Sequence, residues 1–227
     1  MNILCKSLTI AALAVAAGYA SQARAEIFLS ATDGVNTGTA NDLASPGTAS
    51  YSGAIGNFTT SIDIGAGFPA VGAAADPILD LTSLDLATGT AGGTLTVSLS
   101  ETNFTTTTAA KEFLSEISGI YSNSSALMST YYDTTNTHFG TGSLLSSGLS
   151  DNQASLVSEP PISGPYSLTE ILTITAGSNS LTSIDAAIVD APEPASLPLL
   201  GGALLALGLL GWRRIAADDR RPVALLR

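Results

Sequence analysis

The stretch Thr94–Ser100 reads TLTVSLS and alternates hydroxyl-bearing with aliphatic side chains without interruption. A period of two residues is typical of a β-strand with one buried face, because successive side chains of a strand point to opposite sides of the sheet. We therefore expect Leu95, Val97 and Leu99 to point into a core, and the hydroxyl residues between them to face outward.

Other segments show the same alternation and predict further strands. Residues Leu79–Leu86 read LDLTSLDL, and their alternation slips by one residue at Thr82-Ser83, which indicates a β-bulge or a corner. The segment Ala109–Ile117 also fits a helical stripe, so it remains open between a short helix and a strand. Further strands are expected at Ile27–Leu29, at Phe58–Ile64, at Thr182–Ile188 and at Tyr166–Thr175, where Tyr166, Leu168, Leu172 and Ile174 share a face.

The fold class follows from these strands and from what separates them. Serine and threonine make up nearly a third of residues 26–190, and glycine punctuates this part at short intervals. Short strands with frequent turns are typical of sandwiches and barrels. About 165 residues are enough to enclose one core. We predict an all-β fold, a single antiparallel β-sandwich-like domain.

The charges are distributed unevenly along the 227 residues. The formal net charge of the chain is −11, but residues 26–190 contain sixteen acidic side chains and a single basic one, Lys111, and so carry a net −15. Eight Lys and Arg residues in the whole chain cannot form a basic footprint, which excludes a nucleic-acid partner. One cysteine, Cys5, and one histidine, His138, leave no ligand set for zinc, and we expect no metal centre and no cofactor.

The first 25 residues have the three parts of a secretory signal peptide. Lys6 gives a positive start, Leu8–Ala17 is apolar, and Ala23 and Ala25 are the small residues that signal peptidase reads. Cleavage after Ala25 leaves Glu26 as the first residue of the mature protein. The alternative is an uncleaved anchor, but the apolar run is shorter than the roughly 20 residues of a membrane-spanning helix.

A second apolar stretch lies close to the C-terminal end. It begins after Pro192-Glu193-Pro194 and ends at the basic pair Arg213-Arg214. Its apolar core of about 17 residues would extend roughly 26 Å as a helix, just enough to cross a hydrocarbon layer. The positive-inside rule keeps the arginine pair in the cytoplasm and the acidic body outside. The chain thus divides into a signal peptide (1–25), an exported all-β domain (26–190), a linker (191–194), a transmembrane helix (195–212) and a basic cytoplasmic tail (213–227).

This tail resembles the PEP-CTERM sorting signal of Gram-negative bacteria. Pro192, Glu193 and Pro194 match its motif, and Arg213 and Arg214 match its basic cluster. The resemblance implies processing by exosortase, a membrane-embedded transpeptidase, and a path from an inner-membrane-anchored precursor to the cell surface or the extracellular matrix. Exopolysaccharide is a candidate partner there. The alternative is a simple single-pass anchor that contains a chance Pro-Glu-Pro.

The middle of the chain loosely resembles a body that recurs among PEP-CTERM proteins. Three segments carry the likeness, Gly93–Thr105, Tyr132–Gly140 and Pro165–Thr169. No activity is implied for that body, so the resemblance supports export and an all-β fold.

The candidates for chemistry are few. His138 could formally join a Ser-His-Asp triad, but the chain contains no G-x-S-x-G nucleophile elbow, and a histidine in a turn is the simpler interpretation. Asp33–Asn36 and Asp133–Asn136 are candidate calcium loops, although neither matches the EF-hand pattern and both also suit plain turns. We predict no catalytic, cofactor-binding or metal-binding residue and no enzyme activity.

Three asparagines, Asn57, Asn103 and Asn123, occupy N-x-[ST] sequons and are candidate glycosylation sites. Asn103 follows Glu101 at a distance of two residues, as in the extended bacterial sequon. A chain this rich in Ser, Thr and Asn also produces sequons by chance.

Two functions remain open. The first is a non-enzymatic envelope or matrix protein that is exported and sorted by its tail. The alternative is a ligand-binding surface module for glycan, calcium or ice. Ice binding is suggested by the T-x-T pairs Thr94/Thr96, Thr173/Thr175 and Thr88/Thr90, and aligned outward threonine rows would support it.

Overall fold

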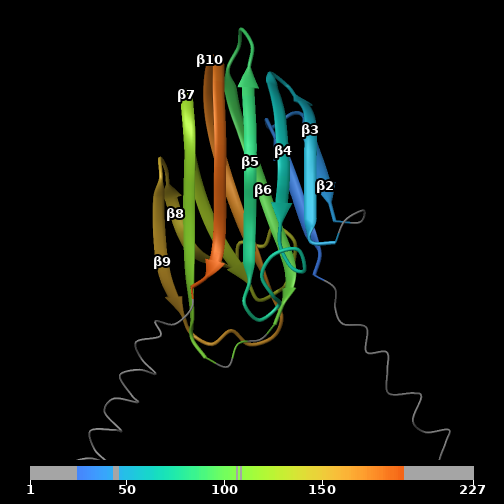
Figure 1. The fold of residues 1–227 in the computed structure, drawn as a ribbon, viewed down its shortest axis with the longest axis vertical. Coiled ribbons are helices and arrows are strands. Elements are labelled where there is room, and N and C mark those ends of the chain that lie inside the picture. Colours follow the sequence, from blue (N-terminus) through green and yellow to red (C-terminus); the bar gives the residue numbers. More distant parts are fainter. Residues whose placement is uncertain (1–24, 43–45, 106, 108, 192–227) are drawn as a thin grey trace, which may run out of the picture. The chain divides into compact units, whose positions relative to one another are not determined.

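The computed structural model describes residues 25–42, 46–105, 107 and 109–191 (Figure 1). These residues form an all-β fold of antiparallel strands, and no helix occurs among them. The strands are β1 Ile27–Thr32, β2 Thr37–Asn41, β3 Thr48–Ile55, β4 Phe58–Ala66, β5 Ile78–Thr88, β6 Gly93–Phe104, β7 Lys111–Asp133, β8 Ser143–Leu149, β9 Gln153–Glu159 and β10 Tyr166–Asp190.

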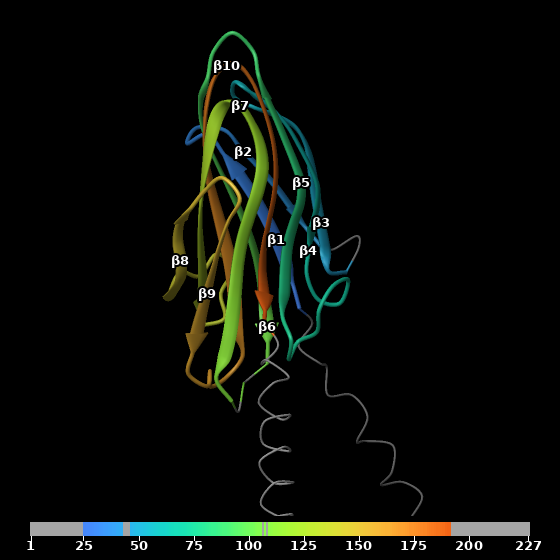
Figure 2. The ribbon, with the colours of Figure 1, turned by 60° about the vertical axis from the view of Figure 1, so that its left-hand side comes forward.

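The sheet is folded into two facing layers because its two longest strands each belong to both (Figures 1 and 2). β7 bends at Asn123, whose φ of 56° is left-handed, and β10 bends beside it, where the register shifts between Ala176 and Leu181. The first layer contains β2, β1, β6, residues 166–176 of β10, residues 124–133 of β7, and β8. The second contains β3, β4, β5, residues 181–190 of β10, residues 111–122 of β7, and β9.

The core lies between the layers and is built from the inward residues of each strand. Leu95, Val97 and Leu99 of β6 are fully buried, as their alternation predicts. Leu99 lies opposite Gly65 of β4, where a Cβ atom would collide with the leucine side chain. Complete burial of such a side chain contributes about 1.5–3 kcal/mol, so these inward rows hold the two layers together.

The predicted slip in β5 is a β-bulge. Leu84 pairs with Ile184 of β10, but the next pair is Leu81 with Ala186, so two residues of β5 face a single residue of β10. Ser83 adopts the left-handed conformation with a φ of 56°, and its N–H donates to Asp185 Oδ1 at 2.8 Å. The bulge allows leucines on both sides of the slip to face the core.

The segment left open between helix and strand is extended. Residues 111–117 form the start of β7 and pair with both β9 and β10. The helical alternative is therefore wrong, because the ladders on both sides bury Phe113 and Ile117 and leave Glu116 outside. Pairing between distant strands overrides a local pattern that fits either structure.

Two glutamates lie in the core among the apolar side chains. Glu101 of β6 and Glu170 of β10 are inward and fully buried, and no carboxyl oxygen of either residue makes a hydrogen bond of good geometry. The predicted inward row of β10 is confirmed, since Tyr166, Leu168, Leu172 and Ile174 are all buried, but Glu170 continues the same row. Alternation fixes the direction of a side chain whatever its polarity.

Candidate ligand-binding face

The outer face of the second layer carries a groove. Register places two rows of side chains next to each other across its strands. One row contains Ile120, Ser183, Asp85, Ser61 and Ser52, and the next contains Ser122, Leu181, Ala87 and Thr59. Because most of these side chains are small, the rows leave a shallow trough of about 540 Å³.

Two aliphatic side chains stand at one side of this groove. Ile120 of β7 is 78% exposed and Leu181 of β10 is 64% exposed, so both offer apolar surface to a ligand. Asp85 is the single charged residue in the lining. The groove therefore offers an apolar rim, several hydroxyls and one carboxylate, a combination suited to a neutral ligand that has both apolar and hydroxyl surfaces. The sequence signal that could have found this site is an aliphatic residue at an outward position of a polar strand face.

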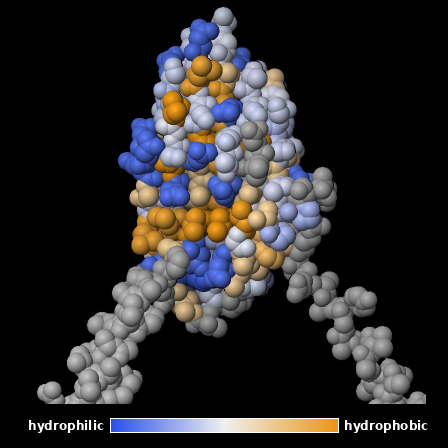
Figure 3. Space-filling model, in the orientation of Figure 1, coloured by the Kyte–Doolittle hydropathy of each residue, from blue (hydrophilic) through white to orange (hydrophobic). Residues whose placement is uncertain are grey.

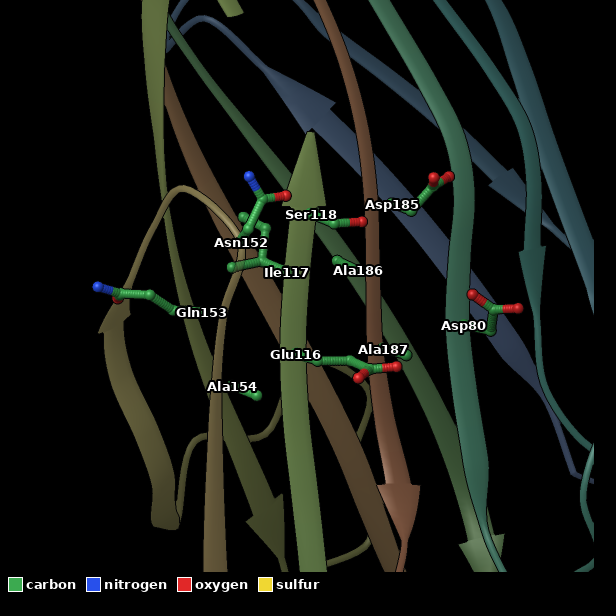
Figure 4. A pocket seen from close by; sticks show the side chains of 10 residues that line it. All are labelled: Asp80, Glu116, Ile117, Ser118, Asn152, Gln153, Ala154, Asp185, Ala186 and Ala187. Atoms are coloured by element: carbon green, nitrogen blue, oxygen red, sulfur yellow. The ribbon is translucent and has the colours of Figure 1, made fainter. Parts of the chain in front are cut away.

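A smaller hollow of about 290 Å³ lies on the same face and is acidic (Figure 4). Asp80, Glu116 and Asp185 come from β5, β7 and β10, while Asn152 and Gln153 close it from the start of β9. Burial raises the pKa of the Asp80 carboxyl, the Thr82 hydrogen bond opposes this, and the charge of Asp185 adds to it. Asp185 already accepts the Ser83 amide, and no group of three or more acidic, His or Cys side chains among the described residues is placed to hold a metal ion.

Burial raises the pKa of the two carboxyls inside the core more than it raises that of Asp80. It raises the pKa of Glu101 to about 9, against the backbone N–H of Phe68 and in concert with the charge of Asp42. Burial also raises the pKa of Glu170 well above its ordinary value, and the charge of Asp80 adds to this. Burial in the core therefore favours the neutral form of both carboxyls. The sequence does not reveal them as inward residues, because an acidic side chain within a strand normally faces outward.

The lower part of this face is apolar. Leu156 of β9, Leu114 of β7, Val189 of β10 and Ile78 of β5 pair successively with one another and form one outward row, called here the apolar row. Figure 3 shows an apolar band that crosses the lower half of the molecule in this view. The face thus changes from groove to acidic hollow to apolar row along its strands.

His138 does not lie in a catalytic arrangement. Its ring contacts Phe28, with 4.1 Å between the ring centroids, and its Nε2 is 3.3 Å from Glu26 Oε2. Two serine hydroxyls bond the backbone of the residues that flank it: Ser100 Oγ accepts the Phe139 amide, and Ser167 Oγ donates to the Thr137 carbonyl. The geometry favours the turn interpretation of this histidine.

The two candidate calcium loops are Asx turns. Asp133 Oδ1 accepts the N–H and the hydroxyl of Thr135, each at 2.7 Å. Asp33 Oδ1 accepts the amides of Val35 and Asn36, and these bonds lower the pKa of Asp33. In both loops the aspartate satisfies donors of its own turn.

The three sequon asparagines use their side-chain amides within the fold. Asn57 Nδ2 donates to the Gly92 carbonyl at 3.2 Å, Asn123 Nδ2 to the Ser178 carbonyl at 2.9 Å, and Asn103 Nδ2 to Thr102 Oγ1 at 3.2 Å. Asn57 and Asn123 are exposed, and Asn103 is half-buried with a left-handed φ of 69°. A glycan on any of them would take one of the two hydrogens of an Nδ2 that already donates within the fold.

The threonine pairs differ in where they point. Thr94, Thr96, Thr173 and Thr175 lie on the outer face of the first layer. The pair Thr88/Thr90 does not belong with them, because Thr88 is buried and its hydroxyl donates to the Gly177 carbonyl at 2.6 Å. This part of the ice-binding prediction is wrong, since Thr88 ends an inward row.

The sorting residues Pro192, Glu193, Pro194, Arg213 and Arg214 lie outside the described residues, as does Ala23. Ala25 is described and is 2% exposed. Glu26, the next residue, accepts the Thr102 amide through its carbonyl at 3.1 Å, so the predicted cleavage point adjoins the start of the sheet. The described residues contain no helical segment that could span a membrane.

Comparisons with known proteins assign no family to this chain. No family model matches the chain, and no curated protein matches it. Two solved structures are similar. The structure of TmCBM61 in complex with β-1,4-galactotriose has a TM-score of 0.30 and 8% identity, over 60% of this chain and 90% of that chain. The enzymatically active domain of tailspike protein 4 from bacteriophage CBA120 has a TM-score of 0.27 and 14% identity, over 60% of this chain and 20% of that chain. Likenesses this distant assign neither a ligand nor an activity to this chain.

Proposed function

We propose that this chain is an exported, non-enzymatic protein of the cell envelope or extracellular matrix, sorted through a PEP-CTERM signal that exosortase processes. In this proposal the two layers form one β-sandwich domain between a cleaved signal peptide and a C-terminal transmembrane helix. The observation that carries it is the order of Pro192-Glu193-Pro194, apolar stretch and Arg213-Arg214. The last strand, β10, ends at Asp190, two residues before the motif.

The surface of the described fold is compatible with this role. Lys111 is the single basic side chain of residues 26–190, and it forms ion pairs with Asp76 and Asp190. All the other charged side chains of residues 26–190 are acidic, which suits a protein that must avoid binding anionic lipid during export.

The sorting proposal is tested in a host that contains an exosortase. We expect the full chain to lose its C-terminal tail, and we expect Arg213→Gln with Arg214→Gln to reduce this processing at least tenfold, because the pair holds the helix end in the cytoplasm. Arg220→Gln with Arg221→Gln is the matched control with the same charge change. Mass spectrometry of the released body gives the cleavage point. Unchanged processing of the first variant would contradict the proposal.

A second candidate function, polysaccharide binding, is favoured by the groove. Sugars present both hydroxyls and apolar C–H faces, and the groove combines hydroxyls with the exposed side chains of Ile120 and Leu181. It faces outward, and Asp85 is the one charged residue in its lining. Exopolysaccharide of the surrounding matrix is the ligand this candidate implies.

Leu181→Asp tests the second candidate. We expect it to reduce retardation of the protein in gels that contain purified exopolysaccharide at least fivefold, because a hydrated carboxylate would replace an apolar side chain that contacts the C–H faces of the sugar. Leu127→Asp is the matched control, since Leu127 is 52% exposed but lies on the outer face of the other layer. Equal retardation of both variants would exclude the groove as the binding site.

A further inference from the structure

Four strands end the two layers, and three of them are protected against further pairing. β2 has five residues, β3 has a register shift between Ala49 and Tyr51, and β8 has two register shifts and a left-handed Gly148. Short strands and bulges are common devices that keep open sheet edges from pairing with other chains.

The fourth edge strand, β9, has none of these devices. Its seven residues, QASLVSE, pair with residues 111–117 of β7 without a register shift. It contains no Lys, Arg or Pro, and Glu159 at its end is its one charge. In the described part of the chain β9 pairs with β7 alone, so the N–H and C=O groups along its other edge are open to a second strand.

The apolar row leads to the same edge. It starts at Leu156 in the middle of β9, which is 56% exposed, and continues through Leu114, Val189 and Ile78. An unprotected edge and an exposed apolar row that ends on it are separate observations, and both indicate that another sheet continues this one.

We propose that β9 pairs antiparallel with β9 of a second copy of this chain, about a two-fold axis at Leu156, so that the second layers of two copies form one continuous sheet. The strand is complementary to itself in this register. Leu156 lies beside Leu156 of the second copy, Ala154 beside Ser158, and Gln153 beside Glu159. The two apolar rows then join end to end across the axis, because a two-fold axis normal to the sheet leaves both outer faces on the same side.

Charge favours this register over the alternatives. Each copy is strongly acidic, with a net −15 over residues 26–190, so copies repel unless their contact is nearly neutral. The antiparallel register separates the two Glu159 side chains by six residues, about 20 Å along the strand, which exceeds the screening length of about 8 Å at physiological salt. Each Glu159 instead faces a glutamine amide. A parallel pairing in register would place the two carboxylates side by side.

Disulfide cross-linking of the full chain tests the register, with Cys5→Ser as background. We expect differently tagged Ala154→Cys and Ser158→Cys chains, produced together and oxidised, to form a mixed dimer. Ala154→Cys alone should cross-link at least fivefold less, because its two sulfurs would start from positions about 13 Å apart along the strands, beyond the Cα separation of about 7 Å that a disulfide spans.

Two further variants keep the test decisive. Leu156→Cys should cross-link to itself, and Leu127→Cys, at an equally exposed leucine of the first layer, should not. Resistance to a protease shows that each variant is folded. A folded Leu156→Cys chain that stays monomeric, or cross-linking that is equal at Leu156 and Leu127, would overturn the proposal. Neither outcome depends on the sorting signal or on a glycan.

Discussion

The outer faces of the two layers are built from the same kind of strand and yet differ in what they present. On the first layer, Thr173, Thr96, Thr32 and Thr37 are paired successively across four strands, and the rows beside them are mostly serine and threonine. On the second, the groove, the acidic hollow and the apolar row follow one another. The inner faces of both layers are mostly apolar. Inward positions therefore decide the fold, and outward positions decide which face is available to a partner.

Val97→Asp should have the largest effect of any change that tests this division. Val97 is fully buried between the layers, so the new carboxylate would have no partner there. We expect a loss of several kcal/mol in the free energy of unfolding, enough to unfold an ordinary domain. Urea denaturation followed by circular dichroism measures it. A loss of less than about 1 kcal/mol would mean that this inward row can open to water.

Glu101→Gln should stabilise the protein, and by an amount that depends on pH. The folded pKa of Glu101 is raised to about 9 from an ordinary 4.5, so the unfolded chain loses this proton at a lower pH than the folded chain. The contribution of Glu101 to stability is therefore complete below about pH 4.5 and is lost progressively as the pH rises towards 9. A glutamine of the same shape removes this loss.

We expect Glu101→Gln to raise the free energy of unfolding at pH 8 by about 2 kcal/mol or more and to change it little at pH 4. Chemical denaturation at the two pH values checks this. Glu116→Gln is the control, because Glu116 is exposed on the outer face. The same gain for both variants would show that general charge repulsion, and not burial, is responsible.

Ser83→Gly should have a smaller effect on the free energy of unfolding, and it tests the bulge of β5 in the second layer. Ser83 holds a left-handed φ of 56° in the bulge of β5, a conformation that costs a residue with a Cβ about 1 kcal/mol. Glycine adopts it freely but also loses more entropy on folding, so we expect a net gain of about 0.5 kcal/mol. The midpoint of thermal unfolding measures it. Ser61→Gly, in a regular strand of the same face, should instead destabilise.

Thr96→Asp should have the smallest effect on stability, less than about 0.5 kcal/mol, because Thr96 faces outward. It is the direct neighbour of Val97, so the two variants compare the two faces of one strand. The same variant tests the ice alternative, since Thr96 lies in the middle of the threonine row. Unchanged growth of ice crystals in the presence of the wild-type protein and the variant would remove that alternative.

The sequence allowed the inward rows and the bulge to be predicted because both are written in local alternation. The long strands β7 and β10 could not be predicted, since the polar residues at their bends, such as Asn123 and Ser178, resemble ordinary turns. The groove could not be predicted from the sequence for a related reason. Its lining comes from five strands that are distant in the sequence, and only their register brings Ser52, Asp85 and Ile120 into one row. Glu170 could not be predicted as an inward residue, because an acidic side chain in a strand normally faces outward.

The bend of β10 also determines how the protein bears mechanical force. Beyond its bend, β10 runs between β5 and β7 and is paired with both as far as Val189. The tail that we propose as the membrane anchor of the precursor begins directly after this strand. Tension directed along β10 would load two hydrogen-bonded ladders in shear at the same time, and it could not open them one bond after another. A protein attached in this way is held at a strong point of its fold, whereas attachment beside the edge strand β9 would leave only one ladder to resist.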